Sequence, residues 1–247
     1  MGSGGSQKIF TTVKSYSKRG QLLKRPDLQT LAESRDLDEL VTRIKNTKYI
    51  DTMNSVVKPY TAEKLEMALR ANLADEQFKI AKSSGNSKIL DAFFQKFIIS
   101  NLKLILKGKI LGKSQEEISA FFNMHAEELA KQRDIVVKAL IAKDLEEAVS
   151  SLGSSPFNAE IQKAVELYNE TKNIQAFDVY FDKMLYQNIT KALRSENDQD
   201  ISHIYGMETD FYNIMSIIRG KFWELDNERI EDLTVSASVN IPNQVMD

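Results

Sequence analysis

The sequence predicts an all-α fold made of two tandem related helical units. Only 4 prolines and 10 glycines occur in 247 residues, which is few for an all-β fold and favours long helices. Apolar residues recur at steps of three and four, as on one face of a helix. In addition, residues 101–109 and 213–221 share one order of Asn, apolar residues, a base, Gly and Lys. An internal copy of this kind indicates a repeated helical unit.

The internal copy sets the expected domain boundaries. Its offset in the numbering is 112 (213 − 101 = 112), while residues 36–41 match residues 144–149 at an offset of 108 (144 − 36 = 108). The two offsets differ by four residues, and a loop between the two matches can accommodate an insertion of that length. We therefore expect a flexible Gly/Ser leader over 1–7, a first helical unit over 8–128, a second over 129–233 and a poorly ordered tail over 234–247.

The first unit contains a series of helix signals. We expect helices over residues 8–23 and 36–45, one that starts at Pro26, and a long one after an N-cap at Thr61. The apolar side of that long helix is carried by Leu65, Leu69, Leu73 and Phe78. Turns are expected over residues 46–49 and 83–87.

The stretch from residue 91 to 113 organises the first unit. Its broad apolar face, which begins just before the stretch at Leu90, predicts a helix that is buried on one side; the residues of this face are Leu90, Phe94, Phe97, Ile98, Leu102, Ile105 and Leu106. Ser114 and Glu117 then fit a capping box. The helix that follows has Ile118, Phe121 and Phe122 on its apolar side.

The two copies repeat an Asn and a Gly that both cost helix stability. Asn101 and Asn213 are expected to bond the backbone of a neighbouring helix. Gly108 and Gly220 either end their helices as left-handed caps or permit close approach of a neighbouring helix or partner backbone. The sequence leaves both interpretations of the glycines open.

Basic residues gather around these glycines, and they are Lys103, Lys107, Lys109 and Lys113 in the first copy and Arg219 and Lys221 in the second. Cations at a helix C-terminus are favourable against the helix dipole, which is a sufficient explanation by itself. The alternative is a docking surface for an acidic partner.

Most kinds of chemistry are excluded or weakly supported. The chain has no cysteine, and its net charge of −2 argues against a dedicated nucleic-acid binder. Residues 108–114 miss the phosphate-binding loop because Lys107 stands where that motif needs Gly. The two histidines, His125 and His203, lack the further ligands of a metal site. We expect no catalytic, cofactor-binding or metal-ligating residue.

Two further features narrow the expected function. Glu208 and Asp210 could form an acid and base pair, but their counterparts in the first copy are Lys96 and Ile98, so a solvated or salt-bridged helix face is expected instead. No apolar run approaches the roughly 18 residues that span a bilayer, so we expect membrane association only through partners.

The order and spacing of these motifs along the chain resemble those of a known protein family, the C subunits of the archaeal A-type ATP synthase. These subunits are equivalent to the d subunits of the vacuolar ATPase. The carrying motifs are residues 16–23, 36–41 with 46–49, 101–109, and 208–213 with 218–221. The resemblance covers essentially residues 8–233. It implies an all-helical funnel of three related units around a pseudo-threefold axis, of which this chain has two and a tail. The chain is then a fragment, a short variant, or one whose third unit a partner replaces.

The resemblance also implies a non-catalytic function without cofactors. Such a protein is a central-stalk socket between the membrane proteolipid ring and the central shaft, and it transmits torque for proton- or sodium-driven ATP synthesis or hydrolysis. It lies peripherally at the cytoplasmic face of the cell membrane. The eight positions expected to serve as scaffold or docking residues are Asn101, Lys107, Gly108, Lys109, Asn213, Arg219, Gly220 and Lys221.

Two other functional classes compete with this one. The first is a stand-alone helical-repeat scaffold that binds a partner helix in a groove. The second is an enzyme with an unrecognised site. From the buried-helix interpretation we expect Leu106→Asp and Ile218→Asp each to unfold its own unit.

Overall fold

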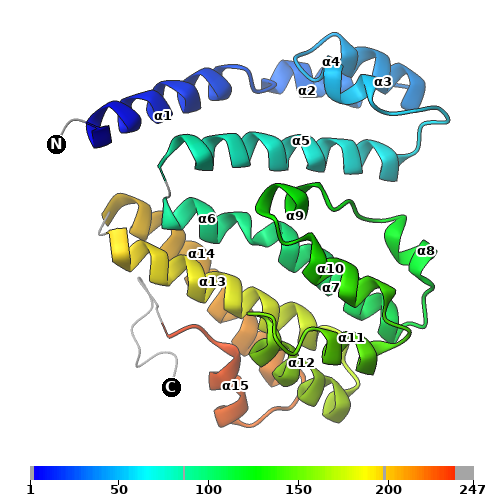
Figure 1. The fold of residues 1–247 in the computed structure, drawn as a ribbon, viewed down its shortest axis with the longest axis vertical. Helices are drawn as coiled ribbons and strands as arrows, with labels where there is room; N and C mark the ends of the chain where they lie inside the picture. The colour runs from blue at the N-terminus through cyan, green and yellow to red at the C-terminus, as the bar shows by residue number, and fades with distance from the viewer. Residues whose placement is uncertain (1–2, 86, 197–198, 237–247) are drawn as a thin grey trace. The chain divides into compact units, whose positions relative to one another are not determined.

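Every regular element that the structure describes is an α-helix, which confirms the predicted all-α class (Figure 1). The structure is a computed structural model, and it describes residues 3–85, 87–196 and 199–236. Its helices are α1 Ser3–Gly20, α2 Arg25–Ala32, α3 Leu37–Lys45, α4 Ile50–Asn54, α5 Ala62–Ser83, α6 Lys88–Phe94, α7 Lys96–Ile110, α8 Gln115–Ser119, α9 His125–Ala130, α10 Arg133–Ile141, α11 Leu145–Ser151, α12 Asn158–Thr171, α13 Ala176–Glu196, α14 Gln199–Phe222 and α15 Asn227–Leu233.

Side-chain caps fix several helix starts, and the sequence predicts those at Thr61 and Ser114. The Asp36 carboxylate accepts from the Glu39 N–H at 2.8 Å at the start of α3, and the Thr61 hydroxyl caps α5. The predicted capping box before α8 is confirmed, because Ser114 Oγ accepts from the Glu117 N–H at 3.1 Å while Glu117 Oε2 accepts from the Ser114 N–H at 2.8 Å. These bonds satisfy backbone donors that a helix start leaves free.

The N-terminal segment differs from the expectation. Helix α1 begins at Ser3, so residues 3–7 of the expected flexible leader are helical, while residues 1–2 lie outside the described part. Pro26 stands in the first turn of α2, as predicted. Of the expected tail, residues 234–236 follow α15 without helix, and residues 237–247 lie outside the described residues.

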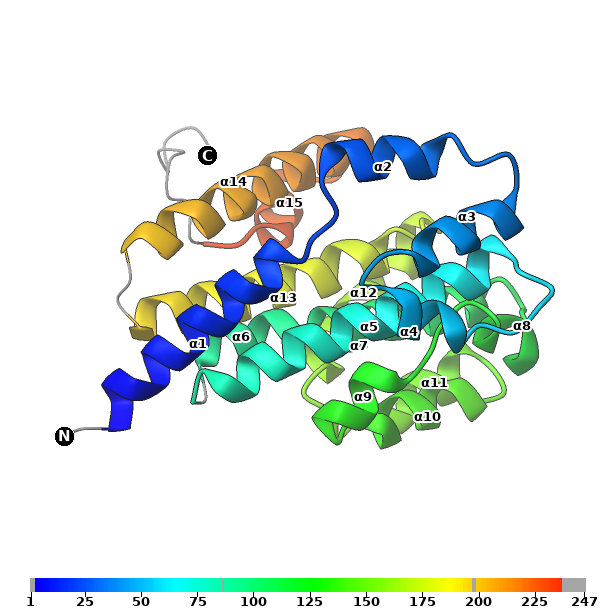
Figure 2. The ribbon, with the colours of Figure 1, turned by 90° about the horizontal axis from the view of Figure 1, so that it is seen from above.

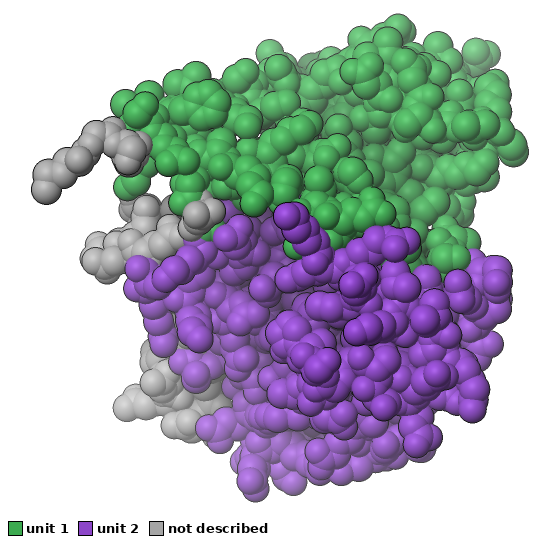
Figure 3. All heavy atoms as spheres, viewed as in Figure 1, with its two compact units in different colours: residues 1–87, 119–130 green, residues 88–118, 131–247 purple. Residues whose placement is uncertain are grey.

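The chain forms two compact units with boundaries that differ from those of the sequence copies (Figure 3). Unit 1 comprises residues 1–87 and 119–130, and unit 2 comprises residues 88–118 and 131–247. Helices α6 and α7 of the first copy thus belong with the helices of the second copy, because they pack against α13. The division into two tandem copies stays a prediction from the sequence.

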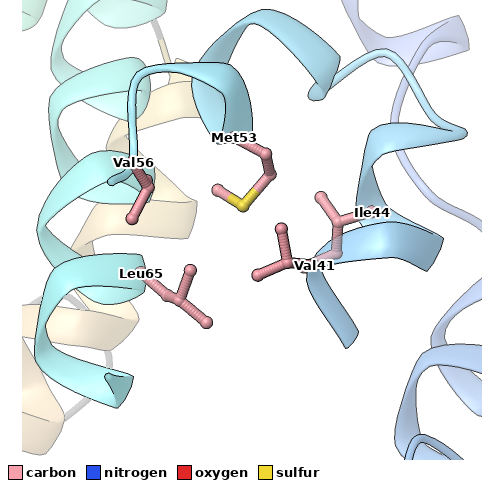
Figure 4. Close-up of a cluster of buried hydrophobic side chains, with 5 residues drawn as sticks. All are labelled: Val41, Ile44, Met53, Val56 and Leu65. Atoms are coloured by element: carbon pink, nitrogen blue, oxygen red, sulfur yellow. The ribbon is translucent and has the colours of Figure 1, made fainter. Parts of the chain in front are cut away.

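Unit 1 is built along α5, which packs against α1, α4 and α9. A small core lies at one end of unit 1, where side chains from α3, α4, α5 and the segment just after α4 point toward one another (Figure 4). This core consists of Val41, Ile44, Met53, Val56 and Leu65. Further along α5, however, Leu69 and Leu73 are exposed, in contrast to the predicted apolar side. Phe121 is likewise exposed, so it does not contribute to the face expected of it.

Unit 2 is built around α13, which packs against α6, α7, α12 and α14 (Figures 1 and 2). Its core contains the fully buried Leu102, Ile105 and Leu106 of α7 with Phe177 and Phe181 of α13. Burial of side chains of this size contributes about 2 kcal/mol each. Unit 2 therefore holds the largest buried apolar faces of the described chain.

The organising stretch forms two helices instead of the expected continuous one. Helix α6 ends at Phe94 and α7 starts at Lys96, with a tight turn at Gln95, whose N–H bonds the carbonyl of Ala92. The Gln95 side chain accepts a hydrogen bond from Asn188 of α13 at 2.9 Å. Gln95 thus joins α6 and α7, which both pack against α13.

Candidate docking surface

Gly108 and Gly220 each allow an isoleucine side chain to pack closely against their helix. Both lie inside their helices, in α7 and α14, and neither has a positive φ. A Cβ built on Gly108 would lie 2.7 Å from Cγ1 of Ile118, and one built on Gly220 would lie 2.6 Å from Cγ1 of Ile230. Ile118 and Ile230 are themselves related by the copy offset (230 − 118 = 112). The structure therefore favours close approach over the cap interpretation, although the approaching group is a side chain and not backbone.

The left-handed caps fall one turn after these glycines. Gly112 has φ 66° and Glu224 has φ 58°, again at the copy offset (224 − 112 = 112). In both helices the next residue donates back to the glycine carbonyl, from the Lys113 N–H to Gly108 at 2.9 Å and from the Leu225 N–H to Gly220 at 3.0 Å. This pattern is the Schellman motif, which satisfies the last free carbonyls of a helix.

Asn213 holds an extended segment of backbone. It is fully buried in α14, and its Nδ2 donates to the Val235 carbonyl at 2.9 Å while its Oδ1 accepts from the Val235 N–H at 2.8 Å. The sequence predicts a backbone partner on a neighbouring helix, whereas Val235 lies just after α15. Asn101 is also buried, in α7. A buried amide that bonds both polar groups of one residue fixes that residue's position.

Lys103 and Lys107 bind carboxylates inside unit 2. Lys107 Nζ donates to both oxygens of Asp178 on α13 at 2.9 Å, and Lys103 Nζ donates to Asp182 Oδ1 at 2.6 Å. The side chains in the two pairs are 15–32% exposed. These lysines thus hold α7 against α13, and they are not offered to an acidic partner.

The other predicted basic residues differ from one another in exposure and in hydrogen-bond partner. Lys109 Nζ donates to the carbonyl of Ala142, just after α10. Lys221 is exposed and donates to Asn227 Oδ1 at 2.9 Å. Arg219 is half-buried on α14. The structure therefore does not gather the predicted basic residues into one patch.

A charged cluster that sequence reasoning missed joins α15 to α12 and α13. Asp232 of α15 accepts from Lys163 Nζ at 2.6 Å, from Lys183 Nζ at 3.2 Å and from the Tyr180 hydroxyl at 3.0 Å. Burial by itself raises the pKa of Asp232, but the hydrogen bonds and charges of the two lysines hold it below its ordinary value. Burial also raises the pKa of the neighbouring Glu160. Only the packing of helices far apart in sequence brings these groups together, so no local motif could have signalled them.

The described residues hold no group of three acidic or histidine side chains that could ligate a metal ion. His125 Nε2 instead lies 2.9 Å from Asp75 Oδ1, and His203 is exposed. Glu208 is exposed while Asp210 is buried. No helix in the described part of the chain has both the length and the apolarity needed to cross a membrane.

Helix α1 faces α5 with polar side chains and turns apolar ones outward. Lys14 Nζ donates to the Lys79 carbonyl at 3.0 Å, Lys18 pairs with Glu76 at 2.7 Å, and the Thr11 hydroxyl donates to the Ser83 carbonyl. The outward side, here called the α1 outer face, consists of the exposed Ile9, Phe10, Val13 and Tyr16. A contiguous exposed apolar face indicates an interaction surface. The periodicity predicts this helix, but it does not reveal which side is covered.

A match to a known family shows to which proteins this chain is related. The model of the ATP synthase (C/AC39) subunit family matches residues 11–247. The chain belongs to this family. The match confirms the resemblance that the sequence motifs indicate.

Relatives of this C/AC39 chain include three archaeal proteins, each named as the C subunit of an A-type ATP synthase. The Methanocaldococcus jannaschii protein is 29% identical over 232 residues, which cover 90% of this chain and 56% of the relative. The Thermococcus kodakarensis protein is 26% identical, with 92% and 60% covered, and the Methanosphaera stadtmanae protein is 25% identical, with 92% and 57% covered. This C/AC39 chain thus spans less than two thirds of the length of each of these three relatives.

Proposed function

We propose that this chain is a non-catalytic central-stalk component of an A/V-type rotary ATP synthase. It acts as a socket between the membrane proteolipid ring and the central shaft, and it passes rotation between them for proton- or sodium-driven ATP synthesis or hydrolysis. The family match over residues 11–247 is the observation that carries this proposal. The chain lies at the cytoplasmic face of the membrane through its partners.

The internal contacts support a role as a stiff coupling. Ile118 and Ile230 seat against Gly108 and Gly220, and α7 is fixed to α13 by two ion pairs. Dense packing of this kind transmits displacement instead of absorbing it. Of the eight predicted positions, Asn213 and the two glycines act as scaffold, and Lys107 and Lys109 support the internal packing of unit 2. Asn101 is assigned to the scaffold on its burial alone.

We assign the α1 outer face as the surface on which other subunits of the stalk dock. A helix in water gains by burying its apolar side, yet α1 turns Phe10, Val13 and Tyr16 away from α5. Such a helix fits a partner that covers these side chains in the assembled machine. Lys221 and Arg219 on α14 are the remaining candidates for contact with an acidic partner.

Co-purification tests the proposal. The tagged chain should bring down proteolipid ring or shaft subunits from its native membranes, and Phe10→Glu with Tyr16→Glu should abolish this capture while helicity stays unchanged. Ile141→Glu, which alters an equally exposed residue on α10, serves as the matched control. Consistent recovery of the chain alone or with unrelated proteins would favour the stand-alone scaffold, and ATP hydrolysis by the isolated chain would favour an enzyme.

A further inference from the structure

Helix α15 is held in unit 2 by two sets of charged contacts. Asp232 accepts hydrogen bonds from Lys163 of α12 at 2.6 Å and from Lys183 of α13 at 3.2 Å. Nearby on α15, Arg229 Nη2 donates to Glu170 Oε1 of α12 at 2.7 Å. Detachment of α15 would therefore break both sets of contacts.

Most of these charged side chains would be solvated if α15 moved away. Those of Lys163 and Asp232 are already 42% and 38% exposed, and those of Arg229 and Glu170 are 37% and 46% exposed. Water replaces the partner of a charge at such positions with little loss of free energy. The contacts among these side chains therefore do little by themselves to keep α15 in place.

Lys183 differs from these groups because it is buried. Its side chain is 9% exposed, and its Nζ donates both to Oδ1 and to the carbonyl oxygen of Asp232. If α15 left, this ammonium group would stay inside unit 2 without Asp232, and an unpaired buried charge is strongly destabilising. Detachment of α15 from an otherwise folded unit 2 therefore requires a second acceptor for Lys183.

Glu160 has the position and the chemistry of this second acceptor. It lies on α12 about one turn before Lys163, and its Oε2 atom is buried without a hydrogen-bond partner among the described residues. Burial raises the pKa of Glu160 while the charges of Lys183 and Lys163 oppose this rise, so the carboxyl group lies close to both lysines. Buried polar atoms in a packed interior are normally bonded, and this one can accept a bond that Asp232 now takes.

We propose that α15 is a latch, and that Lys183 transfers from Asp232 to Glu160 when this latch opens. In the closed state, Asp232 holds Lys183 and Lys163 as the structure shows. In the open state, Glu160 accepts from Lys183 in its place. The buried ammonium group is paired in both states, so α12 and α13 stay packed while α15 detaches and returns. This inference concerns unit 2 alone and does not rest on the rotary function proposed above.

Hydrogen exchange of the α15 amides in the whole chain measures how often the latch opens. Glu160→Gln keeps the size of the side chain and removes its charge, so the open state should become rarer. The α15 amides should then exchange about tenfold more slowly, because a hydrogen bond to a charged acceptor is stronger than one to a neutral acceptor. Glu146→Gln, which changes an exposed carboxylate on α11, should leave the exchange of α15 as in the wild type.

Lys183→Met distinguishes the transfer from a second cause of slower exchange. Glu160→Gln also relieves the repulsion between Glu160 and Asp232 in the closed state, which would slow the opening of α15 as well. Methionine carries no charge, so the open state of the Lys183→Met variant needs no second acceptor. In that background Glu160→Gln should leave the exchange of α15 unchanged, whereas an effect of repulsion would persist.

Three results would overturn the proposal. Exchange of the α15 amides only together with those of α13 in the wild type would show that α15 does not open separately. Equal or faster exchange in Glu160→Gln, with an unchanged circular dichroism spectrum, would exclude Glu160 as the second acceptor. A slowing of the same size with and without Lys183→Met would assign the effect to repulsion in the closed state.

Discussion

Ile230 fills the space that the missing side chain of Gly220 leaves, so that a Cβ on Gly220 would lie 2.6 Å from its Cγ1 atom. We expect Gly220→Ala to destabilise unit 2 by up to about 2 kcal/mol, because overpacking costs about 1–3 kcal/mol and alanine returns about 1 kcal/mol of helix propensity. Urea unfolding measures the difference.

A second substitution and a control isolate the cause. Ile230→Ala, which removes Cγ1 and Cδ1, should make the added cost of Gly220→Ala smaller than it is in the wild type. Gly20→Ala should be neutral or stabilising, because no atom lies within 4 Å of the added methyl. Equal losses at Gly20 and Gly220 would show that the close approach to Ile230 is not the cause.

Asn213→Ala should loosen the segment that follows α15. The substitution leaves the buried N–H and carbonyl of Val235 without their side-chain partner, which costs about 1–3 kcal/mol. Hydrogen exchange should show faster exchange of the Val235 amide in the variant. An unchanged exchange rate at Val235 would contradict the assigned bonds.

Asp232→Asn should lower the free energy of unfolding near neutral pH by about 2 kcal/mol, because Lys183 stays buried without its carboxylate. The loss stays this small because the Asp232 side chain is 38% exposed and solvent screens its charge. The folded-state pKa of Asp232 lies below its ordinary value of 3.8, so its contribution is complete above that pH and is lost as the pH falls through the folded-state pKa.

The expected signature is therefore a gap between wild type and variant that is constant above about pH 5 and closes below about pH 4. Urea titrations near neutral pH and at a series of pH values well below about 4 measure it. Glu33→Gln, which changes an exposed carboxylate, is the control for general charge effects. A gap that persists unchanged in acid would show that the lysine contacts of Asp232 do not stabilise the fold.

Leu106→Asp and Ile218→Asp should differ sharply, although the sequence alone predicts that both unfold their units. Leu106 is fully buried, so a carboxylate there should cost about 4 kcal/mol or more. Ile218 is exposed in the single chain, so its change should stay within about 0.5 kcal/mol. Thermal unfolding at low protein concentration compares the two, and equal losses would contradict the difference in burial.

Features that depend on local sequence were predictable. The caps at Thr61 and Ser114 follow from backbone donors that a nearby side chain can reach, so a short motif carries the information. The all-α class follows from periodicity in the same way. The copy offset also located Gly108 and Gly220 as special positions.

Features that depend on distant packing were not predictable. Leu69 and Ile218 have the spacing of buried residues, yet their exposure depends on which helix covers them, and periodicity does not contain that information. The Asp232 cluster joins residues 49 and 69 positions apart, so no sequence window contains both partners. The role of Gly108 was left open for the same reason, because its neighbour Ile118 lies on the next helix.

The seating of an isoleucine beside a helical glycine has a mechanical consequence. The positions one turn away from Gly220 are Ser216 and Glu224, which both carry side chains, so α14 offers Ile230 no second space of this kind. A shift of α15 along α14 would therefore drive Ile230 against a larger side chain, and a small displacement between these two helices meets a restoring force.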